Sequence, residues 1–457
     1  MLSRTTNGAL TYSPTNPLLA LYFNMVDKAD YIPIVEAAWQ YNQRSTLVLL
    51  YDLRNCRGGK GRRLLFAKAI CHLLDKTNKD ILAHLPIFGS FKDYDLINSI
   101  YPINVPAIYV KYLTEDCLKL FGCTPNKYDD NTPNNTQISL AAKYAPNNKQ
   151  PNAKEIRNQL KCSAKQYRSL LTALRKHLNI VETKMCSNRW CDIDYSTVSS
   201  LAFLKYKDAF RAHDSIRFNE FMASGRKINV CQLYPHEIVK KLFDNDADAC
   251  PMFDQYLTKQ VGLENCVVVC DTSGSMMNGD KVRPLDVAIA LTLIAAFKNK
   301  GVYHNKFFQF SEKSKLVNIK GDNWIERVHN ISREEWGSNT NIQSVFDQLL
   351  KYDDDVKTVL VISDMQFDEC GQSSTNFDEI DRKYSLLERN RPNFVFWNVS
   401  NHCNDIPVKE TTEGVVLVSG YSPSLFKLII ENKGDNITPL KFVENVINQP
   451  MYNIIEI

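Results

Sequence analysis

The chain has 457 residues, of which 44% are hydrophobic and 23% are charged, and its formal net charge is +4 at pH 7. These values are typical of a globular protein with two or three domains. The longest apolar stretch, 287–297, is too short to cross a bilayer, so no membrane anchor is expected. The thirteen cysteines are scattered, without a C-x-x-C pair or a signal peptide, which predicts a cytoplasmic protein without structural zinc.

The charge is distributed unevenly along the chain. Residues 1–250 contain 34 Lys and Arg against 23 Asp and Glu, whereas residues 251–457 contain 21 against 28. A basic surface attracts polyanions such as nucleic acids. We therefore expect a nucleic-acid surface in the first part of the chain and a cation site in the acidic second part.

The pattern of residues 1–250 predicts an all-α domain. Apolar residues recur at helical spacing, with few alternating runs. The helices are expected at 18–26, 32–39, 45–51, 62–74, 107–121, 154–160, 164–177 and 199–213. Two loops rich in Asn and Pro, 128–135 and 145–153, divide the domain into two blocks. Such a series of short helices indicates a helical-repeat-like fold, although no clear period emerges.

Five cations surround three glycines just before one of these helices, namely Arg54, Arg57, Lys60, Arg62 and Arg63. Glycines ahead of a helix can expose backbone N–H groups to a phosphate, and the cations supply the attractive field. The segment is not a Walker loop, because no Ser or Thr follows the lysine. We predict that it contacts RNA; the alternative is an ordinary solvated basic turn.

A second basic group, Lys161, Lys165 and Arg168, lies at the start of a later predicted helix. Helical spacing places the three cations on one face. Tyr167 and Trp190 are candidates for stacking on unpaired bases. The alternative is a solvated helix face with aromatic residues in the core.

From about residue 257 onward, apolar strands alternate with helical segments, which predicts a mostly parallel sheet covered by helices in a Rossmann-like α/β domain, 251–457. The strands are expected at 265–270, 306–310, 315–319, 357–363, 393–399 and 414–418. The helices are expected at 284–299, 322–332, 340–351, 376–389, 423–432 and 438–448. Residues 306–319 form a predicted hairpin, which gives an antiparallel edge strand.

Three polar residues, Asp271, Ser273 and Ser275, follow the first long strand of this domain. Thr340 stands near the start of a helix, and Asp364 follows a second buried strand. Ligands of parallel sheets gather at the carboxyl ends of the strands, and carboxylate and hydroxyl oxygens suit Mg²⁺. The pattern predicts a site for Mg²⁺ or Mn²⁺. The alternative is a Ser-rich helix cap without metal.

These five residues resemble the metal-ion-dependent adhesion site of the von Willebrand factor A family. In that family the two serines and the threonine contact Mg²⁺, the aspartates act largely through water, and a partner's carboxylate takes the sixth position. Met365 stands where the family commonly has glycine, which affects only the local turn. An aspartic protease or a haloacid dehalogenase-type phosphotransferase fits less well, because Ser273 interrupts the first motif and replaces the second acid of the other.

The whole chain also resembles an uncharacterised family of plants and large DNA viruses. The resemblance rests on the segments 52–61, 85–93, 141–146 and 234–239. That family places a helical domain before a von Willebrand factor A domain and is similar in layout to the TROVE proteins, the Ro autoantigen group. TROVE proteins bind structured or damaged small RNAs, and the resemblance implies a similar role in the host cytoplasm or the virion.

These observations favour a non-enzymatic RNA-binding protein whose metal site serves partner docking or domain closure. The alternative is a magnesium-dependent adaptor that captures an acidic side chain of a protein partner without RNA. A third hypothesis is a hydrolase in the helical half, for which His236 beside Glu237 is the candidate pair. Adjacent side chains on a helix diverge, so a packed or capping histidine is the expectation.

Overall fold

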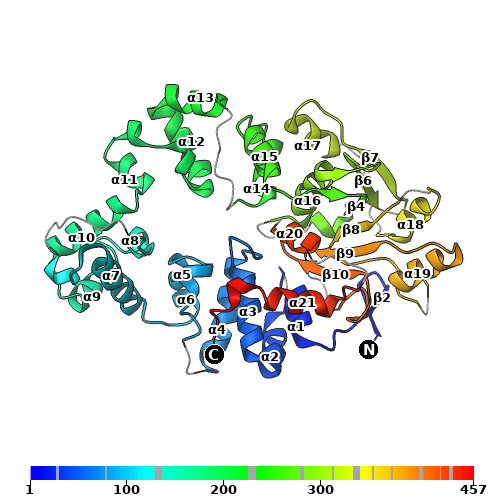
Figure 1. Cartoon of the computed structure of the whole chain (residues 1–457), viewed down its shortest axis with the longest axis horizontal. Helices are drawn as coiled ribbons and strands as arrows, with labels where there is room; N and C mark the ends of the chain where they lie inside the picture. Colours follow the sequence, from blue (N-terminus) through cyan, green and yellow to red (C-terminus); the bar gives the residue numbers. More distant parts are fainter. Residues whose placement is uncertain are drawn as a thin grey trace. The chain divides into compact units, whose positions relative to one another are not determined.

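The computed structural model describes residues 2–26, 30–77, 80–128, 136–224, 233–277, 282–310, 313–332, 340–352, 355–371, 374–400, 405–422, 424–431 and 436–456 (Figure 1). The chain divides into two compact units. Phe66–Arg226 form the first, named here the helical unit, and Met1–Leu65 with Lys227–Ile457 form the second, the sheet unit. This division differs from the predicted boundary near residue 250, because the first 65 residues pack with the second half of the chain.

The sheet unit contains a six-stranded sheet with the strand order β10-β9-β8-β4-β6-β7. Its strands are β4 (Cys266–Asp271), β6 (Lys306–Phe310), β7 (Lys315–Asn318), β8 (Thr358–Ser363), β9 (Asn393–Asn398) and β10 (Val415–Ser419). Neighbouring strands are parallel except β6 and β7, which confirms the predicted antiparallel edge strand. Strands β4 and β10 are buried along their whole length, as their uninterrupted apolar runs indicate.

Helices pack on this sheet or on one another in the sheet unit (Figure 1). They are α14 (Pro235–Phe243), α15 (Ala249–Thr258), α16 (Pro284–Lys298), α17 (Trp324–Ser332), α18 (Gln343–Leu349), α19 (Asn376–Leu386), α20 (Ser424–Glu431) and α21 (Pro439–Ile447). Helix α16 packs against β4 and β8, and α14 packs on α16. Since α16 is apolar on every face, it needs a layer on each side. The helices predicted after residue 257 are confirmed to within three residues.

The first 65 residues begin with a hairpin that was not predicted, β1 (Leu2–Arg4) and β2 (Leu10–Tyr12). The helices α1 (Pro17–Asn24), α2 (Tyr31–Tyr41) and α3 (Gln43–Arg54) follow. Helix α1 packs against β10 and α21 as well as α2 and α3. It has no polar face, because Leu19 and Phe23 are 0% exposed and Leu21 and Tyr22 are 2% exposed. A helix buried all round requires the sheet as a neighbour.

The helical unit confirms the helices predicted from periodicity. It contains most of α4 (Arg63–Leu74), then α5 (Leu85–Phe88), α6 (Lys92–Ile100), α7 (Val105–Phe121), α8 (Ala141–Tyr144), α9 (Ala153–Gln159), α10 (Ala164–His177), α11 (Val181–Cys186), α12 (Ser200–His213) and α13 (Ser215–Ala223). Helix α10 packs against α7 and α8. Most of the predicted loop 128–135 lies outside the described residues. In the described part of the chain, no helix is long and apolar enough to span a membrane.

Candidate cation site and basic surfaces

The predicted cation site lies at the switch point of the sheet. Strand β4 has β6 on one side and β8 on the other. Asp271 is the last residue of β4, Ser363 is the last residue of β8, and the two strands are parallel neighbours. Asp364 follows directly. Open parallel sheets bind ligands beyond the carboxyl ends of strands at such a switch point.

Hydroxyl and amide donors surround Asp271, which is 0% exposed. The Ser363 hydroxyl donates to one carboxylate oxygen at 2.6 Å, and the Ser273 backbone N–H donates to the other at 2.9 Å. The hydroxyl oxygens of Ser273 and Ser275 are 3.1 Å apart. We name Asp271, Ser273, Ser275 and Ser363 the Asp271 cluster. The sequence pattern predicts Asp271, Ser273 and Ser275 but not Ser363, although Ser363 ends a predicted strand.

The charge of Asp364 acts on the Asp271 cluster. Burial, and then the charge of Asp364, raise the pKa of Asp271 to about 7, against the lowering effect of its hydrogen bonds. Asp364 is 1% exposed, and its carboxylate accepts a hydrogen bond from the Gln366 backbone N–H at 3.2 Å. Two buried carboxyl groups that repel each other favour a bound proton or a cation.

Met365 forms the turn between Asp364 and Gln366. Its φ is 63°, in the left-handed region that glycine adopts most easily. Its backbone N–H donates to the Ser363 hydroxyl at 2.9 Å. The turn that the family resemblance associates with glycine is therefore formed here by methionine.

Thr340 belongs to a second group of contacts. Its hydroxyl oxygen lies 2.6 Å from the Gln366 carbonyl oxygen and 2.8 Å from Asp368 Oδ1, and it accepts a hydrogen bond from Asn7 Nδ2 at 2.9 Å. The Thr340 backbone N–H donates to Asp368 Oδ2 at 2.9 Å. Among the described residues, no hydrogen bond joins Thr340 directly to the Asp271 cluster. The main chain of Gln366 connects Thr340 with Asp364.

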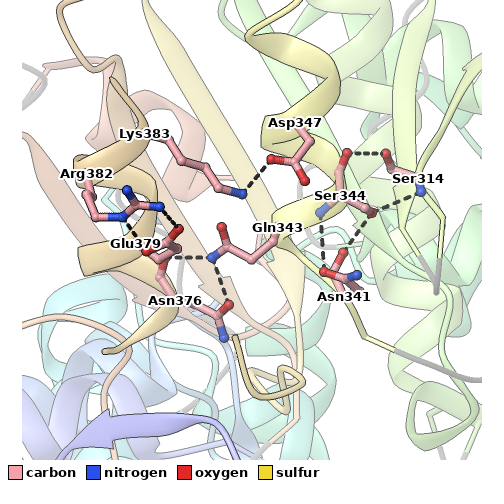
Figure 2. A network of polar contacts seen from close by, with 9 residues as sticks. All are labelled: Ser314, Asn341, Gln343, Ser344, Asp347, Asn376, Glu379, Arg382 and Lys383. Carbon is pink, nitrogen blue, oxygen red and sulfur yellow. Dashed lines mark hydrogen bonds and ion pairs between the residues drawn. The ribbon is translucent and has the colours of Figure 1, made fainter. Parts of the chain in front are cut away.

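Polar contacts fix the helix that follows Thr340 (Figure 2). Gln343 on α18 donates to the carbonyl oxygen and to Oδ1 of Asn376, at the start of α19, both at 2.9 Å. On the other side, the Ser314 hydroxyl and backbone N–H donate to the carbonyl and hydroxyl oxygens of Ser344 at 2.7 and 3.0 Å. Helix α18 is thereby tied both to α19 and to the start of β7, so Thr340 precedes a well-anchored helix.

The donor set of the Asp271 cluster and Asp364 fits a hard divalent cation, which takes carboxylate and hydroxyl oxygens and retains water. Among the described residues, no group of three or more His, Cys, Asp or Glu side chains could hold a metal ion. A cation here would therefore depend on hydroxyl oxygens in addition to the two carboxylates. Asn7 and Asp368, which contact Thr340, have no sequence signal that marks them as part of this region.

Two of the five cations predicted to contact RNA before α4 are buried. Arg54 and Lys60 are 5% and 1% exposed. The Lys60 ammonium donates to the Ser419 hydroxyl at 2.8 Å and to the Tyr22 carbonyl oxygen, and it lies 3.6 Å from the centre of the Tyr22 ring. The prediction of an RNA contact is wrong for these two residues, because both side chains are enclosed within the sheet unit.

The backbone of this segment is also used for packing. The Lys60 and Arg62 N–H groups donate to the carbonyl oxygens of Asp52 and Leu53 at 2.9 and 2.6 Å. A Cβ atom on Gly59 would lie 2.2 Å from the Asp52 carbonyl oxygen, so glycine is required for this close approach. The expected phosphate-binding backbone is therefore a packed turn.

The other three cations of the segment reach the surface to different extents. Arg57 and Arg63 are exposed. Arg62 is half-buried, and its guanidinium lies 4.0 Å from the centre of the Tyr421 ring. These three residues remain candidates for an anion contact in the sheet unit.

The basic group at the start of α10 is exposed as predicted. Lys161, Lys165 and Arg168 all lie at the surface, while Tyr167 on the opposite side of the helix is 0% exposed. The surrounding segment, 141–190, contains eleven Lys and Arg against two Glu. Lys165 and Arg168 share a face of α10, whereas Lys161 precedes the helix with φ 53°, so the prediction that helical spacing aligns all three cations is wrong for Lys161.

The aromatic residues predicted to stack on bases differ in accessibility. The Tyr167 hydroxyl donates to the Pro146 carbonyl oxygen at 2.9 Å, and its burial contradicts a stacking role. Trp190 is half-buried and stacks on His213, with ring centres 4.3 Å apart.

His236 is a packed residue, as expected from the sequence. Its ring stacks on Tyr234 and meets the edge of Tyr421, both with ring centres 5.4 Å apart. Glu237 accepts a hydrogen bond from the Tyr234 backbone N–H at 2.8 Å and caps α14. Neither contact resembles a nucleophile activated by a base.

Comparisons with known proteins connect the chain to uncharacterised families. It is similar to the domain of unknown function DUF2828 over residues 5–92 and 147–265, and to the domain of unknown function DUF7788 over residues 265–448. It is 28% identical to an uncharacterised protein of Acanthamoeba polyphaga mimivirus, over 99% of this chain and 88% of that protein. The viral relative agrees with the resemblance to proteins of large DNA viruses.

The match to DUF7788 coincides with the sheet and its helices, whereas the match to DUF2828 includes parts of both units. Among solved structures, the Ro protein of Deinococcus radiodurans matches with a TM-score of 0.44 and 10% identity, over 90% of this chain and 98% of that chain. This score is too low to establish a shared fold.

Proposed function

We propose that the protein binds RNA through the exposed basic surface of the helical unit and does not catalyse a reaction on it. The observation that carries this proposal is a set of exposed cations whose side chains form no ion pair with another described residue. They are Lys149, Lys154, Lys161, Lys165, Arg168 and Lys176. Cations without a carboxylate partner keep their full charge for phosphate groups.

The spacing of these cations suits a nucleic-acid backbone. Lys165 and Arg168 lie three residues apart near the start of α10, so their side chains point the same way, and Lys161 precedes the helix in a turn with φ 53°. Proteins recognise folded RNA largely through its shape and through contacts with phosphate and 2′-hydroxyl groups. Exposed cations at the start of a rigid helix and in the turn before it provide such contacts.

The test is RNA affinity as a function of salt, for the full chain and for the variant Lys161→Glu/Lys165→Glu/Arg168→Glu. We expect the variant to lose at least about tenfold in affinity, and the log–log salt slope to become shallower by about two to three units, because three phosphate contacts are lost. A matched control reverses three exposed lysines of the sheet unit, Lys300, Lys320 and Lys351. Equal losses in both variants, or no RNA bound at low salt, would contradict the proposal.

The paired acids Asp271 and Asp364 favour a second function. We propose that the sheet-bearing region is a von Willebrand factor A-like domain whose Asp271 cluster, with Asp364 and Thr340, holds Mg²⁺ or Mn²⁺. The ion would offer a coordination position to an acidic side chain of a protein partner. Support comes from two buried carboxyl groups beside two hydroxyls at the switch point of the sheet.

Calorimetric titration of the full chain with Mn²⁺ tests this second function. We expect Asp271→Asn to abolish binding, because it removes one of the two carboxylates proposed to hold the ion, and Ser275→Ala to weaken binding. Glu264→Gln, at an exposed acid of the same unit, is the control and should bind as the wild type does. Binding that persists in Asp271→Asn would refute the site.

Chelation separates the two functions. Adding EDTA should leave RNA binding intact if the surface of α10 carries it, whereas capture of an acidic partner through the ion should collapse. Because a relative is encoded by a mimivirus, we propose the cytoplasm of an infected cell or the virion as the location.

A further inference from the structure

Residues 4–8 of the N-terminal hairpin lie along residues 366–369, beside the proposed cation site. The Thr5 hydroxyl donates to the Phe367 carbonyl oxygen at 3.1 Å, and the Thr6 backbone N–H donates to Gln366 Oε1 at 2.9 Å. Gly8 forms an antiparallel bridge with Asp368. The segment is therefore held by both backbone and side-chain contacts.

Asn7 is the residue of this segment that reaches Thr340. Its Nδ2 donates to the Thr340 hydroxyl oxygen and to the Gln366 carbonyl oxygen, both at 2.9 Å. Asn7 is exposed, whereas Thr340 is only 1% exposed. An exposed amide that contacts a buried hydroxyl lies on the solvent side of that hydroxyl.

The contacts of Thr340 leave one lone pair of its hydroxyl oxygen for another ligand. One lone pair accepts the Asn7 N–H, and the hydroxyl hydrogen points to the Gln366 carbonyl oxygen or to Asp368. The Asn7 N–H also places positive partial charge where a cation would approach the oxygen. A cation that uses Thr340 must therefore displace the amide or bind against its repulsion.

We propose that residues 4–8 are an intramolecular competitor of the cation, and that Asn7 lowers the affinity of the site by holding the Thr340 hydroxyl. This inference rests on the cation site proposed above. By linkage, a bound cation weakens the attachment of the N-terminal segment as much as the segment weakens the cation. The hairpin thus makes the position of residues 4–8 depend on the divalent cation concentration.

The test compares Mn²⁺ affinity by calorimetry in the full-length wild type, Asn7→Ala and Arg4→Ala. Arg4 belongs to the same segment but forms an exposed ion pair with Glu369 at 3.0 Å and does not contact Thr340. We expect Asn7→Ala to bind Mn²⁺ about threefold to tenfold more tightly, the range that the net strength of one hydrogen bond gives. Arg4→Ala should change the affinity by less than about twofold, because an exposed ion pair adds little to the attachment of the segment. Asn7 is exposed, so its truncation leaves the core intact.

A second measurement does not depend on affinity. Hydrogen exchange at the Thr6 amide, which donates to Gln366, should become faster when wild-type protein is saturated with Mg²⁺. Unchanged affinity in Asn7→Ala, together with loss of binding in Asp271→Asn, would overturn the competitor and leave the cation site standing. No Mn²⁺ binding in any of these proteins would overturn both.

Discussion

Two charged side chains, Lys60 and Asp52, lie in the interior of the sheet unit, 1% and 2% exposed. Burial lowers the pKa of Lys60 to about 7, although the charge of Asp52 acts in the opposite direction. Burial raises the pKa of Asp52, while the charge of Lys60 and a hydrogen bond from the Tyr452 hydroxyl at 2.8 Å lower it. Each group therefore favours the charged form of the other against the cost of burial.

We expect Lys60→Met to lower the free energy of unfolding at pH 7 by about 3 kcal/mol, because it leaves the buried carboxyl of Asp52 without its opposing charge. The wild type should also show a pH dependence. The folded-state pKa of Lys60, about 7, lies below its unfolded value, so the folded state holds fewer protons above pH 7. The free energy of unfolding therefore rises with pH from about 7 to 10, by at most about 1.4 kcal/mol per unit.

Urea unfolding at pH 7, 8 and 9 measures both effects. The rise with pH should disappear in Lys60→Met, because the titrating group is gone. Lys259→Met, at an exposed lysine of the same unit, serves as the control, and its free energy of unfolding should rise with pH as that of the wild type does. If Lys60→Met had the wild-type free energy of unfolding and the wild-type dependence of that free energy on pH, the two buried groups would not interact.

At the scale of single elements, sequence patterns predicted the strands and the motif whose residues are close together in the sequence. Strands β4 and β8 were predicted from uninterrupted apolar runs, and the motif after β4 identified Asp271, Ser273 and Ser275 because these residues are adjacent in sequence. Strands β1 and β2 have three residues each, too few for a period to be read. The contact between Asn7 and Thr340 joins positions 333 residues apart, for which one sequence carries no signal.

The segment before α4 shows the limit of local charge patterns. Its cations look alike in sequence, but Lys60 meets Ser419 at the end of β10, 359 residues further along the chain. Whether a cation of this segment is buried or exposed therefore depends on its contacts with β10. On α10 the prediction of a shared solvent face holds for Lys165 and Arg168, because the periodicity of one helix distinguishes its buried face, which contains Tyr167, from its solvent face. It fails for Lys161, which lies before the N-cap residue Ser163, where helical periodicity does not apply.

At the scale of the whole molecule, the helical unit is an insertion in the sheet unit. The sheet unit is assembled from Met1–Leu65 and Lys227–Ile457, and the intervening residues form their own compact unit. The two sides of the insertion meet, because the Tyr234 hydroxyl donates to the Gly61 carbonyl oxygen at 2.6 Å. Insertion is tolerated where the chain enters and leaves at neighbouring points. The predicted boundary near residue 250 instead separates residues 1–65 from the sheet with which they pack.

Two truncations distinguish these divisions of the chain. Replacing residues 66–226 by a short Gly/Ser linker should leave a sheet unit that unfolds cooperatively, because α1 keeps its contacts with β10 and α21. A fragment of residues 1–250 should instead expose the apolar surface of α1, including Leu19 and Phe23, and bind a hydrophobic dye. Circular dichroism during thermal unfolding and dye fluorescence provide the readouts. Cooperative unfolding of the 1–250 fragment without dye binding would show that the first 65 residues belong with the helices after all.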